Sequence, residues 1–204
     1  MPSQSKLLST KIIKDRRSIR SYKNKKVSKK IILEIIKLAN LAPTAGGKEN
    51  RRFIIIKDIK VREKIFQASL KQDHLKHTPV IIAVTFNKKI LNPKKSILDA
   101  KKWGISYWGA TEKNYTQNKK FMQNWKIWEN TWPIQDADAA ITTLCLAAKA
   151  FGLGTCWIGL FEQDKVKKIL KIPQNYQIAA LITLGYQKDP PYPQKRKKIK
   201  ELIS

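Results

Sequence analysis

The stretch Asp136-Ala-Asp-Ala-Ala-Ile-Thr-Thr-Leu-Cys-Leu-Ala-Ala-Lys-Ala-Phe151 decides how the rest of the chain is arranged. Its apolar positions recur at helical spacing and form a broad face made mostly of small side chains. These positions are Ala137, Ala140, Ile141, Leu144, Cys145, Ala147 and Ala148. Small side chains allow neighbouring elements to approach closely, so we predict a central, buried helix that is capped by Gly152.

Apolar, mostly β-branched runs on both sides of this helix predict strands, and amphipathic runs between them predict further helices. The predicted strands are Arg52–Lys57, Pro79–Phe86, Gly154–Gly159 and Tyr176–Tyr186. The predicted helices are Ser5–Lys14, Val61–Leu70, Gln163–Leu170 and one that Ser28 caps and that stops at Ala42, before a proline. Strands separated by helices indicate an α+β or α/β sandwich.

Two segments do not fit this pattern. Residues 87–132 are polar, Lys-rich and aromatic, with some helical character over Phe121–Trp128. Interleaved Lys and Trp would suit stacking on nucleic-acid bases, helices over a planar ligand, or a dimer interface. We interpret the segment as a variable lid or interface. The tail, residues 189–204, begins with Pro-Pro-Tyr-Pro and does not belong to a compact core by itself.

The composition predicts one folded domain over residues 1–204 with a strongly basic surface. The chain has 42% hydrophobic residues and a formal net charge of +27. Such a charge attracts polyanions. However, the lysines are spread along the whole chain and no nucleic-acid-binding motif is present, so we expect a generic basic surface and consider nucleic acid an unlikely partner.

Targeting signals and metal-ligand patterns are missing from the sequence. Residues 1–10 lack the apolar core of a signal peptide, and no apolar run approaches the ~20 residues of a bilayer span. Cys145 and Cys156 lie in apolar surroundings without metal-ligand spacing, so we expect buried, inert thiols and no metal site. We therefore expect a soluble, cytoplasmic protein without membrane contact.

The segment Asp15-Arg-Arg-Ser-Ile-Arg-Ser-Tyr22 places three arginines within five residues, in a chain whose positive charge is mostly Lys. In an extended backbone, Arg16, Ser18 and Arg20 would point to one side. Guanidinium groups that flank a hydroxyl suit a phosphate, because Arg binds phosphate oxygens through two donors at once. A solvated basic turn is the alternative interpretation of these residues.

Common catalytic sets are absent from the sequence. The only histidines are His74 and His77, and neither belongs to a recognisable nucleophile motif. No paired-carboxylate motif, P-loop or GxGxxG fingerprint occurs. An enzyme with so few acid–base groups would need a cofactor for its chemistry, and the arginine segment would suit a cofactor that carries a phosphate.

Four separated features resemble the nitroreductase family of flavin-dependent oxidoreductases, from Arg16 almost to the end of the chain. The features are Arg16–Arg20, Ala42–Gly47, the run from Ile134–Ala140 through Leu146–Ala148 to Gly152–Gly159, and Leu184–Tyr186 with its basic tail. The resemblance implies a three-layer α+β sandwich with a central mixed β-sheet flanked by helices. It also implies a homodimer that binds FMN at the subunit interface, with the C-terminal tail exchanged between subunits.

The resemblance also implies roles for individual residues. Arg16, Arg17 and Ser18 would hold the FMN phosphate together with Arg196, and Arg20 would lie at the pyrimidine end of the ring. The residues expected along the ring are Pro43, Thr44, Ala45, Gly47, Glu49, Ile158, Gly159 and Leu160. Gly47 and Glu49-Asn50 stand where many relatives have Asn and Gln-Pro: the glycine removes a side-chain contact, and Glu49 would bring negative charge unless it turns to solvent or pairs with Arg51 or Arg52.

The implied reaction is a ping-pong transfer of hydride from NADH or NADPH, through FMN, to a small electron-poor acceptor such as a nitroaromatic or a quinone. The flavin carries the chemistry, so no catalytic side chain is expected. Two alternatives stay open. One is another flavin reaction on the same fold, such as dehalogenation or flavin breakdown. The other is a non-catalytic, basic protein that binds flavin or polyanions.

Overall fold

The computed structural model describes residues 4–88 and 125–203. The predicted lid at residues 87–132 therefore lies largely outside the described residues. The described helices are α1 (Gln4–Asp15), α2 (Lys29–Asn40), α3 (Ile59–Gln67), α4 (Asp73–His77), α8 (Trp125–Ala150) and α9 (Gln163–Leu170), with 3-10 turns η1 (Ala45–Gly47) and η3 (Ile199–Glu201). The described strands are β1 (Arg51–Ile56), β2 (Val80–Asn87), β3 (Gly154–Ile158) and β4 (Tyr176–Gly185).

The four described strands form one sheet in the order β1-β2-β4-β3, and every neighbouring pair is antiparallel. We expected a mixed sheet. Within the described residues, the parallel component is an isolated bridge between Ser18 and Thr155, which places the arginine segment along the outer edge of β3.

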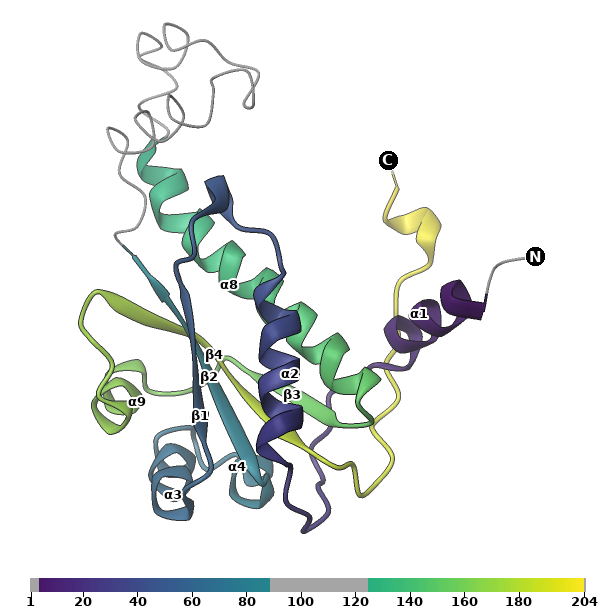
Figure 1. Cartoon of the computed structure of the whole chain (residues 1–204), viewed down its shortest axis with the longest axis horizontal. Coiled ribbons are helices and arrows are strands. Elements are labelled where there is room, and N and C mark those ends of the chain that lie inside the picture. The colour runs from purple at the N-terminus through teal and green to yellow at the C-terminus, as the bar shows by residue number, and fades with distance from the viewer. Residues whose placement is uncertain (1–3, 89–124, 204) are drawn as a thin grey trace, which may run out of the picture.

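Helices cover both faces of this sheet and give three layers (Figure 1). Helices α2 and α8 cover one face, and α3, α4 and α9 cover the other. The central strand β2 is apolar almost throughout because it is buried on both sides. Its side chains alternate: Ile82 and Val84 pack on the α2/α8 side, and Ile81 and Ala83 pack on the opposite side.

Helix α2 begins where the sequence predicts. The Ser28 side chain accepts a hydrogen bond from the Ile31 amide at 3.3 Å, so Ser28 is the N-cap. On the inner side of the helix, Ile32, Ile35 and Ala39 are fully buried against the core. Leu38 is exposed instead, because it lies on the outer side of the helix.

Helix α8 is longer than the sequence analysis predicted. The predicted small-residue face is buried as expected, and Gly152 follows the helix with φ of +71°. However, the helix begins at Trp125 and not at Asp136, so part of the predicted variable segment is regular helix. Pro133 lies inside this first half, although proline is unfavourable in the interior of a helix.

The sequence analysis also missed helix α4, which follows α3 after a tight turn. Leu70 and Lys71 both have positive φ in this turn, which is uncommon for residues other than glycine. Five residues are too few to show a helical apolar repeat, so periodicity could not reveal this element.

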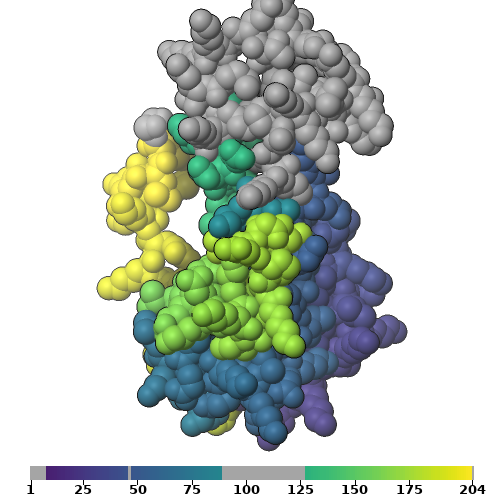
Figure 2. Space-filling model, turned by 90° about the vertical axis from the view of Figure 1, so that its left-hand side faces the viewer, coloured from purple at the N-terminus to yellow at the C-terminus, as the bar shows by residue number. Residues whose placement is uncertain are grey.

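The C-terminal tail leaves the sandwich after β4. Its first residues follow the N-terminal segment, where the Lys188 amide donates to the Ser21 carbonyl at 3.0 Å. Beyond these residues the tail extends along one side of the molecule, partly separated from it (yellow in Figure 2). Ile199, Leu202 and Ile203 are largely exposed there, so the tail has apolar side chains that its own chain does not cover.

Candidate functional site

The arginine segment is fixed against strand β3 by backbone and side-chain packing. The Ile19 amide donates to the Thr155 carbonyl at 2.8 Å, and the Ile19 side chain is only 4% exposed. This side chain lies directly over Gly154, where an added Cβ would be 2.6 Å from Ile19 Cγ1. The glycine therefore allows the segment to lie close to the sheet.

Tyr22 fixes the other end of the segment. Its hydroxyl donates to the Ile19 carbonyl at 2.6 Å and lies 2.6 Å from the Thr183 hydroxyl, inside the protein. Burial raises the pKa of Tyr22 far above its usual value, so the phenol stays neutral and keeps its donor. The backbone between Ile19 and Tyr22 is thus held at both ends.

The three arginines of this segment have different surroundings. Arg17 donates through Nη1 to the carbonyls of Lys14 at 2.5 Å and Arg16 at 2.8 Å, so its guanidinium is bound to the C-terminal end of α1. Within residues 4–88 and 125–203, neither Arg16 nor Arg20 has its guanidinium held by a hydrogen bond or ion pair. These two cations are therefore available to an anion, whereas Arg17 would first have to release the helix end.

Two buried thiols lie beneath the arginine segment. Cys156 is hydrogen-bonded to the Ser18 side chain and Cys145 to Thr155, and Arg16 lies close enough to affect both thiols. Burial raises the pKa of both thiols, so they stay protonated at neutral pH. Both cysteines are free and buried, as predicted.

The loop that follows α2 is anchored by Arg51, which the sequence analysis did not select. Its guanidinium donates to four carbonyls and is almost completely buried. The acceptors are Asn40 at 2.8 Å, Ala42 at 2.7 Å, Pro43 at 3.2 Å and Asp136 at 3.1 Å. One side chain therefore ties the end of α2 and the start of the loop to α8.

Asp136 completes this anchor. Its carboxylate accepts from the Ala45 amide at 2.9 Å and from Asn50 Nδ2 at 3.1 Å. Burial raises the pKa of Asp136, and this effect outweighs the opposing hydrogen bonds and the charge of Arg51. We call Asn50, Arg51 and Asp136 the loop anchor.

Of the residues that depart from the family pattern in this loop, Asn50 belongs to the loop anchor, and Gly47 and Glu49 lie outside it. Gly47 has φ of +65° and open space around its Cα, which suits a glycine. Glu49 is exposed and accepts a hydrogen bond from Asn40 Nδ2 at 3.3 Å. Its negative charge therefore faces solvent, one of the two arrangements that the sequence analysis considered.

The end of β3 combines a buried residue with two open ones. Ile158 is 2% exposed and packs in the core, so its side chain is not available to a ligand. An added Cβ at Gly159 would meet nothing within 4 Å, and Leu160 is 63% exposed. The Leu160 carbonyl accepts from Gln72 Nε2 at 2.8 Å, which connects this corner to the turn between α3 and α4.

The arginine segment and the 43–47 loop, which hold most of the predicted site residues, lie at two separate places in one chain. The arginine segment lies at the level of Cys145 on α8, and the 43–47 loop binds Asp136. Nine residues of helix separate these two levels, which corresponds to about 14 Å along the axis. Arg196 lies in the tail, where its Nη2 donates to Gln194 at 2.7 Å, and it is exposed.

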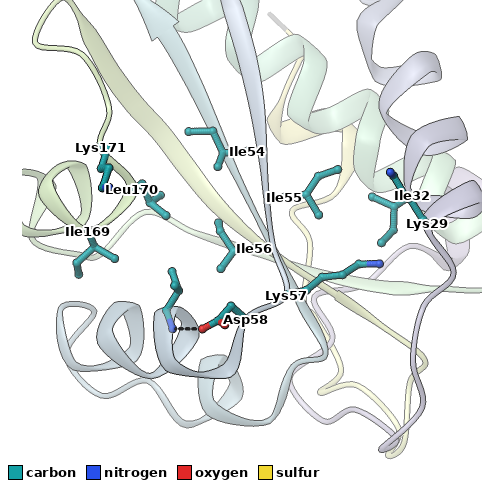
Figure 3. Close-up of a pocket in the computed structure, with 11 residues that line it drawn as sticks. Lys29, Ile32, Ile54, Ile55, Ile56, Lys57, Asp58, Ile169, Leu170 and Lys171 are labelled. Carbon is teal, nitrogen blue, oxygen red and sulfur yellow. Dashed lines mark hydrogen bonds between the residues drawn. The ribbon is translucent and has the colours of Figure 1, made fainter.

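An apolar groove of about 530 Å³ lies elsewhere, along β1, which is the edge strand among the four described strands (Figure 3). Ile54 and Ile56 point toward α9, and Ile55 points toward α2. The groove contains none of the predicted cofactor-binding residues. In the described part of the chain, no cluster of three or more His, Cys, Asp or Glu side chains could hold a metal ion. No described helix is both long and apolar enough to cross a bilayer.

The model of the nitroreductase family matches residues 13–186, which include the arginine segment, the loop anchor and all four strands. The chain belongs to the nitroreductase family. The predicted family and the α+β sandwich are therefore confirmed.

Individual nitroreductase relatives align over most of their length. A protein of Archaeoglobus fulgidus, whose name pairs NADH dehydrogenase with NAD(P)H nitroreductase, is 27% identical over 88% of this chain and 85% of its own. A nitroreductase family protein of Streptococcus pneumoniae has a TM-score of 0.74, with 20% identity over 96% of this chain and 98% of that one. A protein of Exiguobacterium sibiricum solved in complex with FMN has a TM-score of 0.73, with 22% identity over 96% and 95%.

The loop anchor and the α3–α4 turn are the structural features around the candidate site that sequence reasoning missed. Asp136 was quoted only as part of a motif, although a carboxylate on a helix face that is otherwise small and apolar is itself a signal of a buried polar contact. Arg51 lies at the start of an apolar strand, and a charged residue at that position is likewise a signal of a buried polar contact.

Proposed function

We propose that this nitroreductase family member is an FMN-dependent oxidoreductase that uses NADH or NADPH to reduce a small electron-poor acceptor. The observation that carries the proposal concerns Arg16 and Arg20, on the segment fixed beside β3: among the residues that the structure describes, neither guanidinium has a hydrogen bond or ion pair. The open corner at Gly159 and Leu160 lies at the end of the same strand. A phosphate and a flat ring connected to it would fit these two features together.

The residues present suit FMN in charge and in space. Arg16 and Ser18 would hold the phosphate, and Arg20 would face the pyrimidine end of the ring. A fixed cation there would favour the reduced, negatively charged form, since preorganised charge stabilises charge that develops. Bound FMN would supply hydride transfer, which explains why the chain offers few acid–base side chains. Gly159 would leave room for a flat nicotinamide or acceptor.

We further propose that the working unit is a homodimer in which a second copy contributes its 43–47 loop to each site. The separation of about 14 Å between the two groups of site residues supports this proposal. Exposed apolar side chains near the loop also support it: Leu41 is 79% exposed, and Ile127 and Ile134 are exposed on the first half of α8.

The groove at the sheet edge supports a tail exchange between the two copies. Its floor is apolar, it runs along the edge strand β1, and an edge strand accepts a further strand through its unpaired backbone groups. The tail of a second copy offers Ile199, Leu202 and Ile203, which its own chain leaves exposed. We propose that these side chains occupy the groove.

The first prediction concerns flavin binding. The purified protein should retain FMN after desalting, and NADH or NADPH should bleach its visible absorption under anaerobic conditions. Arg16→Ala should weaken FMN binding by roughly 10- to 150-fold, because it removes hydrogen bonds to a charged group worth about 1.5–3 kcal/mol. FMN affinity is measured by fluorescence titration of the apoprotein. Arg52→Ala removes a similar charge beside Tyr176 and should leave FMN affinity unchanged. Unchanged affinity in Arg16→Ala would contradict the phosphate site.

The second prediction concerns the dimer. Leu202→Asp should shift the protein toward monomer by placing a charge in an apolar groove, which is costly without a partner. Lys195→Asp changes the charge of the same tail without removing an apolar side chain, and it should remain dimeric. Light scattering during size-exclusion chromatography measures both. A monomeric wild-type protein, or a dimer that Leu202→Asp leaves intact, would rule out this exchange.

A further inference from the structure

Two large apolar side chains are exposed at the corner where β3 ends. Leu160 is 63% exposed shortly after the strand, and Leu70 is 65% exposed in the turn between α3 and α4. Next to Leu160, an added Cβ at Gly159 would meet nothing within 4 Å. Exposed apolar side chains that gather beside open space are typical of a surface that binds a ligand.

Hydrogen bonds hold the α3–α4 turn against this corner. The side-chain amide of Gln72 donates from Nε2 to the Leu160 carbonyl at 2.8 Å and to the Ser69 carbonyl at 3.0 Å. The Glu162 amide donates to the Ala68 carbonyl at 2.8 Å. The two segments that carry the exposed leucines are therefore in direct contact.

The turn has an unusual backbone conformation. Leu70 has φ of +52° and Lys71 has φ of +50°, in the left-handed region that residues other than glycine rarely adopt. The Lys71 amide donates to the Phe66 carbonyl at 3.2 Å, and this bond helps to hold the turn. Strained backbone of this kind occurs most often at active sites and ligand contacts. Here it leaves the side chains of Leu70 and Lys71 exposed next to each other in the chain.

Lys71 supplies an unpaired positive charge at this corner. Within residues 4–88 and 125–203, its ammonium group has no hydrogen bond or ion pair. The acidic side chains nearby have other partners. The Glu162 carboxylate lies 2.8 Å from Lys165 Nζ, and the Asp73 carboxylate lies 3.7 Å from His77 Nε2. The charge of Lys71 is therefore available to an anion from solution.

We propose that the corner formed by Leu70, Lys71 and Leu160 selects an electron-poor acceptor with a flat apolar body and an anionic group, such as an aromatic carboxylate. This inference rests on the proposed function and names its class of acceptor. The two leucines would contact the body of the acceptor above Gly159. The Lys71 ammonium would pair with the anionic group, which its flexible four-carbon side chain can follow. The net charge of +27 would attract such an acceptor from solution.

Two acceptors that differ in charge test this inference. 4-Nitrobenzoate and 4-nitrobenzamide share a nitroaromatic ring, and only the first is anionic at neutral pH. The quantity compared is the ratio of kcat/KM for nitrobenzoate to kcat/KM for nitrobenzamide, measured on FMN-loaded protein with saturating NADH or NADPH. Lys71→Met should lower this ratio by about 2- to 5-fold, the effect of losing one solvent-exposed ion pair, and Lys71→Arg should retain it. An unchanged ratio in Lys71→Met would overturn the proposal.

Lys60→Met is the matched control, because it removes one exposed positive charge from the opposite end of α3. It should leave the ratio unchanged. An equal fall in both variants would show that only the overall charge of the protein attracts the anion, and the role of Lys71 would be overturned. Leu70→Ala should lower kcat/KM for both acceptors alike, because it removes apolar contact but no charge. Unchanged values would overturn the contact with the acceptor body.

Rapid-mixing experiments separate the acceptor from the nicotinamide donor. In Lys71→Met, reoxidation of the reduced flavin by nitrobenzoate should be slower than in the wild type. If reduction of the flavin by NADPH were slowed instead, the recognised anion would belong to the donor, and the proposal would be overturned. FMN that does not bind, or that neither nicotinamide reduces, would remove the proposed function itself.

Discussion

Arg51→Met should lower the free energy of unfolding by about 3–5 kcal/mol, the range for breaking a buried charge network by removing one partner. Methionine fills similar space but donates no hydrogen bond. The carbonyls of Asn40, Ala42, Pro43 and Asp136 would lose their donor, and the Asp136 carboxylate would lose its neighbouring cation. Chemical denaturation followed by circular dichroism measures the loss.

The adjacent residue provides the control for this prediction. Arg52 is exposed and places its guanidinium over the Tyr176 ring at 4.2 Å. Arg52→Met should cost about 0.5–1 kcal/mol, as expected for an exposed cation–π contact. If Arg51→Met proved no more destabilising than Arg52→Met, the loop anchor would not be holding the loop.

Gly154→Ala should have the second largest effect, through a single added methyl group. The new Cβ would lie 2.6 Å from Cγ1 and 2.8 Å from Cβ of Ile19, too close for a rotation of the side chain alone to relieve. The segment from Arg16 to Arg20 would have to move away from β3. We expect a loss of about 1–3 kcal/mol of stability, as for other overpacked sites, together with weaker FMN binding.

Gly159→Ala is the matched control for stability, because an added Cβ there meets nothing within 4 Å. It should unfold at nearly the same denaturant concentration as wild type. A smaller residue at position 19 should also rescue the first variant: Gly154→Ala combined with Ile19→Gly, which removes the three atoms nearest to the added Cβ, should recover FMN binding relative to Gly154→Ala alone. Normal stability and normal FMN affinity in Gly154→Ala would show that the segment does not need this close approach.

The helices, strands and helix ends that were predicted correctly are those determined by residues close together in the sequence. The continuous apolar stretch from Val80 to Phe86 indicates a strand that is buried on both faces, and the spacing of apolar residues in α9 indicates an amphipathic helix. The observed bounds of β2 and α9 are therefore close to the predicted ones. Ser28 and Gly152 mark helix ends through their own hydrogen bonds and φ angle. The resemblance adds the arginine segment and the loop, whose functional roles remain predictions.

The features that were missed depend on contacts between distant parts of the chain. Arg51 and Asp136 are 85 residues apart in the sequence, and no local sequence pattern predicts the contact between them. The first half of α8 contains Pro133, a residue that is unfavourable in the interior of a helix. Lys71 is one of many lysines in the sequence, and the contact between its turn and Leu160 is what distinguishes it.

The loop anchor has a consequence for the thermodynamics of ligand binding. Because Arg51 and Asp136 hold residues 43–45 as part of the folded core, the conformational entropy of that backbone is lost when the chain folds and not when a ligand arrives. A ligand that contacts the loop meets a preorganised surface, and its affinity is not reduced by ordering that part of it. Mutations in the anchor should therefore weaken binding through entropy, even though none of the three anchor residues would touch the ligand.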